Sequence, residues 1–292
     1  MRAEDVQRAA VLGAGTMGHG IAQVLAMAAI ETRLYDVDAR AASAGLEKIR
    51  ANLDKGVQKG KVAPELREGS LARLSTTSEL ARAVEGVELV IEAVPEQLPL
   101  KEKLFGDLSR QLGANVLLAT NTSSLSVTQI ARAALHPARV VGMHFFNPVH
   151  LMKLVEVVRG ETSSPEAVAT AIGIARRLGK DPIEVRDAPG FASSRLGVAI
   201  GLEAMRMLEE GVASAADIDK AMVLGYGFPM GPLELTDLVG LDVRLAIAEY
   251  LARELGERFA PPRVLREKVA RGELGKKAGL GFHDWTNGRM ER

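Results

Sequence analysis

The sequence predicts an α/β fold with a mostly parallel sheet, followed by an all-α C-terminal domain. Three observations support this prediction. Short apolar runs alternate with helix-length amphipathic patterns as far as residue 185, a glycine-rich turn joins the first run to the first helical pattern, and residues 191–270 contain no convincing strand pattern. Strands that alternate with helices require crossover connections, which place neighbouring strands parallel and cover both faces of the sheet.

The elements of the first domain follow from the hydrophobic pattern in chain order. The first strand ends at Val11 and Leu12, helical spacing runs through 17–29, and residues 32–35 form the second strand. Further strands are predicted at 71–75, 89–94, 116–120, 140–144, 154–158 and 182–185, and further helices at 79–84, 99–112, 126–134 and 165–178. The continuous apolar run at 89–94 is typical of a strand that is buried on both faces.

Residues 39–68 interrupt this alternation. The segment is rich in Lys, Arg, Glu and Ala, and its apolar residues Leu46, Ile49, Leu53 and Val57 recur at spacings of three and four. That spacing predicts an amphipathic helix or a pair of helices. The segment is too long and too polar for a simple crossover, so we expect an inserted helical arm.

The pattern changes again after the Asp-Ala-Pro-Gly stretch at 187–190. An apolar stripe with helical spacing follows, and it consists of Leu196, Ile200, Leu202, Met205 and Leu208. Residues 235–255 predict another amphipathic helix. We therefore predict two domains, 1–187 and 188–292, and we expect the stripe of the second domain to face a core or a dimer interface.

Composition and charge exclude several classes of protein. The chain has 292 residues, 47% hydrophobic and 25% charged, which excludes disordered, collagen-like and coiled-coil proteins. Lys+Arg and Asp+Glu both number 37, so the net charge gives no footprint for nucleic acid or an anionic membrane. The absence of cysteine excludes disulfides, thiolate nucleophiles and cysteine-based zinc sites, and no metal is expected. The longest apolar run, 21–30, is far too short to span a bilayer, and we expect a cytoplasmic protein.

A G-x-G-x-x-G motif occupies residues 13–18, between the first strand and the first helix. Its candidate cofactor-binding residues are Gly13, Gly15, Thr16, Met17 and Gly18. The first glycine permits a tight turn, the second lets the backbone approach a pyrophosphate, and the third lets the helix pack on the strand. The helix N-terminus offers unpaired N–H groups to the phosphates. The motif predicts a Rossmann-type, mostly parallel sheet that binds a dinucleotide; a glycine turn without a ligand is the alternative.

Asp36 ends the second predicted strand, where a carboxylate that binds the ribose is expected. A carboxylate there accepts a hydrogen bond from the 2′-hydroxyl and repels a 2′-phosphate. Val37 and Asp38 follow it, with no arginine directly after. The sequence therefore favours NAD over NADP, although a solvated aspartate remains the alternative.

His144 is the candidate base that an alcohol dehydrogenation requires. It ends a predicted strand on the side of the sheet where cofactor and substrate are expected to meet. Glu156 lies on the following strand and is a candidate to fix the tautomer of the imidazole and to stabilise the imidazolium. A core histidine with a backbone partner is the alternative for His144.

Two other polar segments have a functional and a structural interpretation each. The stretch Asn121-Thr122-Ser123-Ser124 follows a strand, so it either binds a substrate or the nicotinamide ribose, or only caps the next helix. On the inserted arm, Arg50, Lys55, Lys59 and Lys61 either hold a phosphorylated substrate tail or form a solvated charged face.

The whole chain resembles the L-3-hydroxyacyl-CoA dehydrogenases of the bacterial 3-hydroxybutyryl-CoA type. The resemblance rests on motifs spread from end to end of the sequence. They are VLGAGTMG (11–18), IEAVPE (91–96), NTSSL (121–125), HFFNP (144–148), KLVEVV (153–158), DAPGF (187–191), PMGP (229–232) and GKKAGLGF (275–282). The combination is far more specific than any one motif.

The resemblance implies a role for several residues. It makes His144 and Glu156 the catalytic pair and places Ser123 near both substrate and cofactor. It assigns cofactor-side positions to Glu96, Lys101, Asn147 and Lys277, and it makes the inserted arm a CoA clamp with Lys59 as a CoA contact. The family motif P-G-F-x-x-N-R has Ser194 here in place of Asn, so this substrate-binding position carries a shorter side chain with one polar group.

The resemblance implies reversible, NAD-dependent oxidation of a (3S)-3-hydroxyacyl-CoA to the 3-oxoacyl-CoA in fatty acid metabolism and β-oxidation, by a homodimer. A short substrate such as 3-hydroxybutyryl-CoA is expected. The alternatives are a longer or dicarboxylic substrate such as 3-hydroxyadipyl-CoA, a hydroxy or sugar acid without CoA, or a non-catalytic dinucleotide sensor. The basic arm has little purpose without a CoA tail, and the His144 and Glu156 pair argues against a mere sensor.

Overall fold

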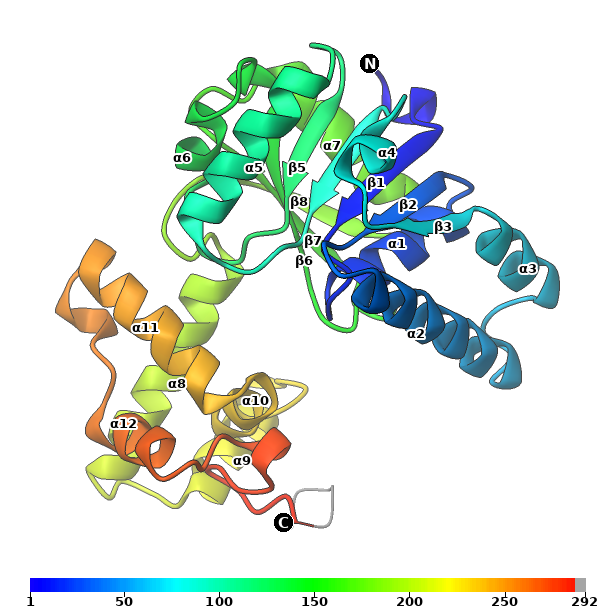
Figure 1. Ribbon diagram of the computed structural model, residues 1–292. Coiled ribbons are helices and arrows are strands. Elements are labelled where there is room, and N and C mark those ends of the chain that lie inside the picture. Colours follow the sequence, from blue (N-terminus) through cyan, green and yellow to red (C-terminus); the bar gives the residue numbers. More distant parts are fainter. Residues whose placement is uncertain (287–292) are drawn as a thin grey trace. The chain divides into compact units, whose positions relative to one another are not determined.

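A computed structural model describes residues 1–286 of the chain. The chain divides into two compact units, residues 1–191 and residues 192–292 (Figure 1). Each unit has a hydrophobic core of its own. The two units are therefore described separately.

The first unit is built on one eight-stranded sheet. Its strands are β1 (Arg8–Leu12), β2 (Glu31–Tyr35), β3 (Leu74–Thr77), β4 (Leu89–Glu92), β5 (Leu117–Thr120), β6 (Val140–Phe145), β7 (Leu154–Arg159) and β8 (Asp181–Arg186). Their order across the sheet is β3-β2-β1-β4-β5-β6-β7-β8, and every neighbouring pair is parallel except β6 and β7. The predicted fold class, a Rossmann-type mostly parallel sheet followed by helices, is confirmed.

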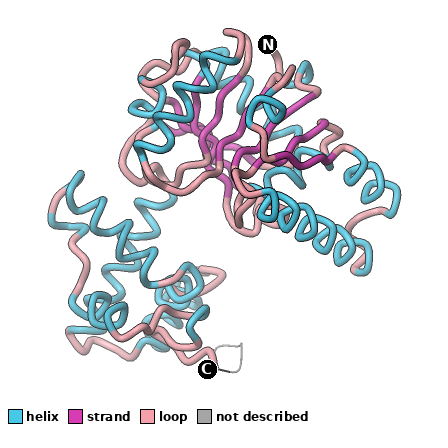
Figure 2. The backbone as a smooth tube through the Cα atoms, viewed as in Figure 1, coloured by secondary structure: helices cyan, strands magenta, loops and turns pink. Residues whose placement is uncertain are grey.

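Helices cover both faces of this sheet (Figure 2). They are α1 (Gly18–Met27), α2 (Ala39–Gln58), α3 (Pro64–Ala72), α4 (Leu80–Val84), α5 (Leu98–Gln111), α6 (Val127–Arg132) and α7 (Pro165–Arg177). Two separate cores result because successive strand residues point to opposite faces: Ala9 and Val11 of β1 join the core with α1 and α7, whereas Ala10 and Leu12 join the core with α5 and α6. The central strands are thereby buried on both sides.

The inserted segment forms the helix pair α2 and α3, which projects beside the sheet in Figure 1. The Asp38 side chain caps α2 by accepting a hydrogen bond from the Arg40 amide at 2.8 Å. Ile49 and Leu53 are buried against α1, as the three-and-four spacing predicts. The strand expected at 71–75 begins later, at Leu74, because α3 continues through Ala72.

The second unit contains five α-helices among its described residues. They are α8 (Ser193–Glu209), α9 (Ala215–Tyr226), α10 (Pro232–Val239), α11 (Leu241–Leu255) and α12 (Arg263–Ala270). The single helix predicted over 235–255 was wrong, since α10 ends and α11 begins at Gly240. Gly240 has a φ of 102°, a left-handed value that interrupts a helix and that other residues rarely adopt.

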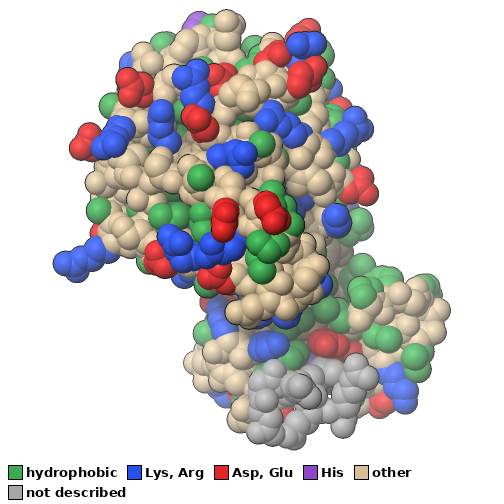
Figure 3. Space-filling model, turned by 90° about the vertical axis from the view of Figure 1, so that its right-hand side faces the viewer, with side chains coloured by type: hydrophobic (Ala, Val, Ile, Leu, Met, Phe, Trp, Pro, Cys, Tyr) green, Lys and Arg blue, Asp and Glu red, His purple; other side chains and the backbone are tan. Residues whose placement is uncertain are grey.

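Charged side chains of both signs are interspersed over the face of the first unit shown in Figure 3. This mixture agrees with the equal numbers of acidic and basic residues in the sequence. Among residues 1–286, no helix combines the length and the apolar composition that a membrane crossing needs.

Candidate active site

The turn between β1 and α1 has a geometry that requires glycine at two positions. Gly13 has a φ of 98°, and its amide donates to the Tyr35 carbonyl oxygen at 2.8 Å. A Cβ on Gly18 would lie 1.6 Å from the Gly13 carbonyl oxygen, so the start of α1 packs directly on the turn. A Cβ on Gly15 would meet nothing within 4 Å. Backbone atoms therefore pack closely against Gly13 and Gly18, at the two ends of the turn. The space beside Gly15, where a pyrophosphate is expected, is open.

Asp36 directly follows β2 and is attached to this turn. One carboxylate oxygen, Oδ2, accepts a hydrogen bond from the Ala14 amide at 2.9 Å, and the other, Oδ1, accepts one from the Asp38 amide at 3.2 Å. A carboxylate has about four acceptor sites, so it keeps capacity for ribose hydroxyls.

A cavity of about 470 Å³ opens at the carboxyl ends of β1, β2, β4, β5 and β6. It brings together most of the residues that the sequence singled out, from five separate stretches of the chain. The predicted site residues that line it are Gly13, Gly15, Thr16, Met17, Asp36, Glu96, Ser123 and His144. Ligands of open parallel sheets bind at this edge, so the cavity is the candidate active site.

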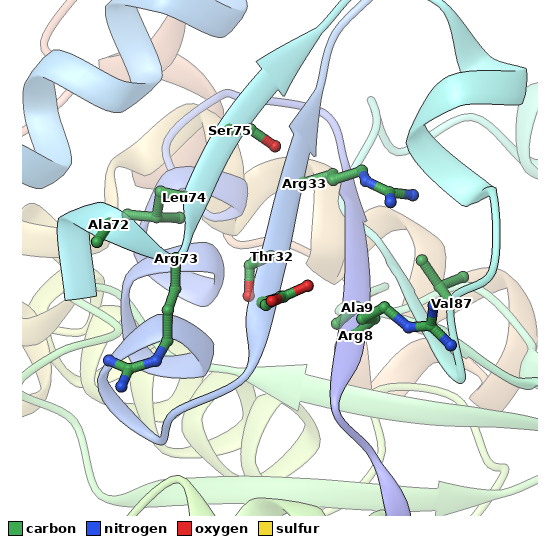
Figure 4. A pocket seen from close by; sticks show the side chains of 10 residues that line it. Arg8, Ala9, Thr32, Arg33, Ala72, Arg73, Leu74, Ser75 and Val87 are labelled. Carbon is green, nitrogen blue, oxygen red and sulfur yellow. The ribbon is translucent and has the colours of Figure 1, made fainter. Parts of the chain in front are cut away.

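Another cavity, of about 200 Å³, lies at the opposite edge, where β1, β2 and β3 begin (Figure 4). Two of its three arginines are already engaged. Arg8 pairs with Glu88 at 2.8 Å, and Arg33 donates to the carbonyl oxygens that end α4, including that of Arg82 at 3.1 Å. We therefore place the chemistry in the cavity that contains His144.

His144 and Glu156 form a buried pair across β6 and β7. The two residues are direct partners in the antiparallel ladder, and Nδ1 of His144 lies 2.7 Å from Oε2 of Glu156. The Glu156 side chain is completely buried, and His144 is 7% exposed. The rings of Phe146 and Phe191 pack on the imidazole at 4.5 and 5.9 Å. Because Nδ1 is engaged by the carboxylate, Nε2 is the nitrogen that can exchange a proton with a ligand.

Glu96 connects the turn after β5 to a buried ion pair. Its Oε1 accepts from the Thr122 hydroxyl at 2.6 Å and from the Ser123 amide at 2.8 Å, and its Oε2 lies 3.3 Å from Nζ of Lys101. Burial alone would raise the pKa of Glu96, but the Lys101 ammonium and the hydrogen bonds from Thr122 and Ser123 hold it below its usual range. The carboxylate is thereby kept ionised at the mouth of the cavity.

Lys101 itself does not line the cavity. It is 1% exposed, and its ammonium also lies 2.6 Å from the completely buried Glu92 carboxylate at the end of β4. Sequence reasoning missed Glu92 because it ends an apolar strand. The signal that was available is a carboxylate within a run such as Leu-Val-Ile-Glu-Ala-Val, which a buried strand tolerates only with a partner.

The remaining predicted site residues lie elsewhere. Asn147 is exposed after β6, and Lys59 is exposed at the end of α2; neither lines the cavity. In the second unit, Ser194 is in the first turn of α8, and Lys277 forms an ion pair with Asp242 at 2.6 Å. Within residues 1–286, no group of His, Asp or Glu side chains is arranged to hold a metal ion.

Comparison with known proteins gives consistent matches over both units. The family described as 3-hydroxyacyl-CoA dehydrogenase matches with its NAD binding domain over residues 8–188 and with its C-terminal domain over residues 190–285. A probable 3-hydroxybutyryl-CoA dehydrogenase of Bacillus subtilis is 43% identical over 282 residues, which cover 96% of this chain and 98% of that protein.

Two further relatives differ in how much of them the chain spans. The 3-hydroxyadipyl-CoA dehydrogenase of Escherichia coli is 44% identical over 290 residues, which are 99% of this chain and 60% of that protein. The crystal structure of (S)-3-hydroxybutyryl-CoA dehydrogenase from Ralstonia eutropha superposes with a TM-score of 0.92 at 37% identity, over 96% of this chain and 99% of that one.

Proposed function

Because the chain belongs to the 3-hydroxyacyl-CoA dehydrogenase family, we propose that its His144 and Glu156 pair performs the proton transfer of that family's reaction. The chain is an NAD-dependent oxidoreductase that acts on 3-hydroxyacyl-CoA. The observation that carries the proposal is that His144, which is paired with the buried Glu156 carboxylate, lines the same cavity as a dinucleotide-type glycine turn.

The residues of this cavity fit NAD. The open space beside Gly15 leaves room for a pyrophosphate next to backbone amides. The Asp36 carboxylate has free acceptor capacity for ribose hydroxyls. When bound, NAD supplies the hydride acceptor. The negative charge of Asp36 supports a preference for NAD over NADP.

His144 acts as the general base in this proposal. The Nδ1–H group donates to Glu156, which leaves Nε2 unprotonated and able to take the proton of the 3-hydroxyl group. The ring becomes an imidazolium as it takes the proton, and the carboxylate 2.7 Å away stabilises that charge. Burial of both side chains strengthens this stabilisation, because the local dielectric is low.

We propose a short (3S)-3-hydroxyacyl-CoA such as 3-hydroxybutyryl-CoA as the substrate. The support is the B. subtilis relative, which matches along nearly its full length. The E. coli relative, named for 3-hydroxyadipyl-CoA, favours a dicarboxylic substrate as the second candidate. Lys59, at the end of α2, is the proposed contact of the CoA tail, together with Arg50, Lys55 and Lys61 of the inserted arm.

A substrate panel tests this function. NADH formation is measured by absorbance with 3-hydroxybutyryl-CoA, 3-hydroxyadipyl-CoA and free 3-hydroxybutyrate. We expect the CoA esters to be oxidised with much higher kcat/KM than the free acid, and the butyryl ester to exceed the adipyl ester. Equal efficiency on the ester and the free acid contradicts the CoA assignment.

We also propose that the enzyme is a cytoplasmic homodimer. Leu196 and Ile200 lie one turn apart on α8 and are 64% and 37% exposed, an apolar strip of the kind that a second subunit covers. Light scattering at micromolar concentration measures the mass, for which twice 31.2 kDa is expected.

A further inference from the structure

Glu92 is a completely buried carboxylate at the carboxyl end of β4, in the middle of the sheet. Three donors satisfy it. Oε1 accepts from the Val94 amide at 2.7 Å and from the Lys101 ammonium at 2.6 Å, and Oε2 accepts from the Thr120 hydroxyl at 2.6 Å. Glu92 does not line the active-site cavity, whereas Val94, two residues later, does. It is a buried ionisable group that the proton transfer does not use.

Lys101 stands between Glu92 and Glu96. Its Nζ lies 2.6 Å from the Glu92 carboxylate, 3.3 Å from the Glu96 carboxylate and 3.4 Å from the Val94 carbonyl oxygen. The contacts with Glu92 and the Val94 carbonyl are hydrogen bonds, and the contact with Glu96 is an ion pair. The shortest contact goes to Glu92, so Glu92 determines where the ammonium is held.

Glu96 connects Lys101 to the turn after β5. Its Oε1 accepts hydrogen bonds from the Thr122 hydroxyl and from the amides of Ser123 and Ser124, at 2.6, 2.8 and 3.2 Å. Ser123 lines the cavity together with His144. A continuous series of ion pairs and hydrogen bonds therefore runs from Glu92 through Lys101 and Glu96 to the wall of the active site.

We propose that Glu92 is a positioning residue of the dehydrogenase: it holds Lys101, and through Lys101 it holds Glu96 and the turn 122–124 against the cavity. The proposal rests on the proposed function for its kinetic consequence only. A hydrogen bond between two charged groups is about twice as strong as a neutral one. If Glu92 loses its charge, the ammonium moves toward the remaining carboxylate and draws Glu96 away from the turn.

The Glu92→Gln variant tests this proposal with little change in packing. Lys101 keeps an anionic partner in Glu96, so no unpaired charge is left in the interior. We expect a Tm within a few degrees of wild type and a kcat/KM lower by about ten- to hundredfold, the usual size of an effect of small misplacement. Asp107→Asn, which neutralises the partner of the exposed Lys103 and Arg110 on the same helix, is the matched control and keeps wild-type kcat/KM.

A double-mutant cycle separates positioning from a general structural role. We expect Glu92→Gln to cost less in the background of Thr122→Val than in wild type, because both variants interrupt the same series of contacts while Lys101 keeps Glu96 as an anionic partner. Amide hydrogen exchange supplies a readout that does not depend on turnover: Ser123 and Ser124 exchange faster in Glu92→Gln than in wild type. This readout stands even if the substrate assignment fails.

Unchanged kcat/KM with unchanged amide exchange in Glu92→Gln overturns the proposal, as do fully additive effects in the cycle. If Glu92→Gln does not fold, Thr120→Val is the second variant, since it removes one donor to Glu92 and leaves every charge in place. We then expect a severalfold loss of kcat/KM with faster exchange at Ser123; wild-type values of both exclude the positioning role.

Discussion

Oδ2 of Asp36 accepts a hydrogen bond from the Ala14 amide at 2.9 Å, so the carboxylate that follows β2 is fastened to the turn that follows β1. The two halves of the proposed nucleotide site are thus connected before any ligand binds. The carboxylate needs no reorientation to meet a ribose, which lowers the entropic cost of binding.

Replacing Asp36 is expected to weaken NAD binding and to relax the preference over NADP. In Asp36→Ala, both the ribose acceptor and the contact with Ala14 are lost, so we expect the Kd for NADH to rise by about tenfold or more. Asp36→Asn keeps an acceptor for Ala14 and loses only the charge, so it mainly changes the NADP to NAD ratio. Fluorescence titration with both nucleotides measures this, and an unchanged Kd for NADH in Asp36→Ala refutes the assignment.

His144→Gln is expected to lower kcat by about 10² to 10⁴ while NADH binding persists, the usual size for loss of a general base. Glu156→Gln lowers kcat as well, because a neutral amide can either accept from or donate to Nδ1, so it neither fixes the tautomer nor stabilises the imidazolium by charge. Since the two residues act as a unit, the double variant should be little worse than His144→Gln alone. Near-wild-type turnover of His144→Gln removes it from the role of base.

Gly18 and Gly15 make a matched pair for testing the glycine turn. A Cβ at Gly18 would overlap the Gly13 carbonyl, so Gly18→Ala must displace backbone, and we expect both Tm and NADH affinity to fall. Gly15 has open space around it, so Gly15→Ala should keep the wild-type Tm and lose affinity only. Thermal melts with and without NADH distinguish the two; a lower Tm for Gly15→Ala without NADH argues against the open turn.

The second unit should lose stability as pH rises through the range in which His283 titrates. Its Nε2 lies 2.7 Å from Oδ2 of Asp219, and this hydrogen bond raises the pKa of His283, with the charges of Asp219, Asp237 and Glu234 acting in the same direction. A raised pKa in the folded state means that the stabilisation is complete below the unfolded pKa of about 6.5 and is lost as pH rises through the folded value.

Denaturant unfolding at several pH values measures this effect. The difference in free energy of unfolding between wild type and His283→Gln should be largest below pH 6 and should shrink toward pH 8. A difference that stays constant with pH would show that the histidine does not gain a proton on folding.

The buried Arg244 side chain is expected to lower the free energy of unfolding of a single chain. It occupies the core-facing stripe of α11 with Leu241, Ala248 and Leu251, it is 7% exposed, and burial lowers its pKa to about 10, so it stays charged at pH 7. Among residues 1–286, the buried Nε of its guanidinium has no hydrogen-bond partner. Burying a charged group with an unsatisfied N–H is costly.

Arg244→Met should therefore raise the free energy of unfolding by about 1–3 kcal/mol, the range seen when buried charges are replaced by apolar side chains. Arg253→Met, on the exposed side of the same helix, is the control and should change it by less than about 0.5 kcal/mol. Denaturant unfolding of both variants measures this, and a loss of stability in Arg244→Met would show that the guanidinium meets an anion.

The apolar runs predicted which segments become strands, but they carry no information about direction. The runs at 140–144 and 154–158 are β6 and β7, and these two strands are antiparallel in an otherwise parallel arrangement. A parallel connection needs a crossover of about a dozen residues or more. The segment 146–153 between them is too short for such a crossover, so its length indicated that the two strands are antiparallel.

Some site residues could be predicted from local sequence motifs, whereas others depend on contacts between distant parts of the chain. Gly13, Gly18 and Asp36 stand at fixed offsets from a strand and a helix, so the motif alone indicated where they lie. Glu92 and Lys101 are on different elements, and their contact exists only because α5 packs across the end of β4. The hydrophobic pattern of each segment does not predict a contact between the two segments.

The pairing of β6 with β7 limits which sequence changes can preserve the His144 and Glu156 pair. His144 and Glu156 are matched by backbone pairing, and the segment 146–153 between them takes no part in it. The register of the ladder, rather than the length of that connection, sets Glu156 opposite His144. A slip of one residue along the ladder would turn Glu156 to the opposite face of the sheet and leave the imidazole without its carboxylate.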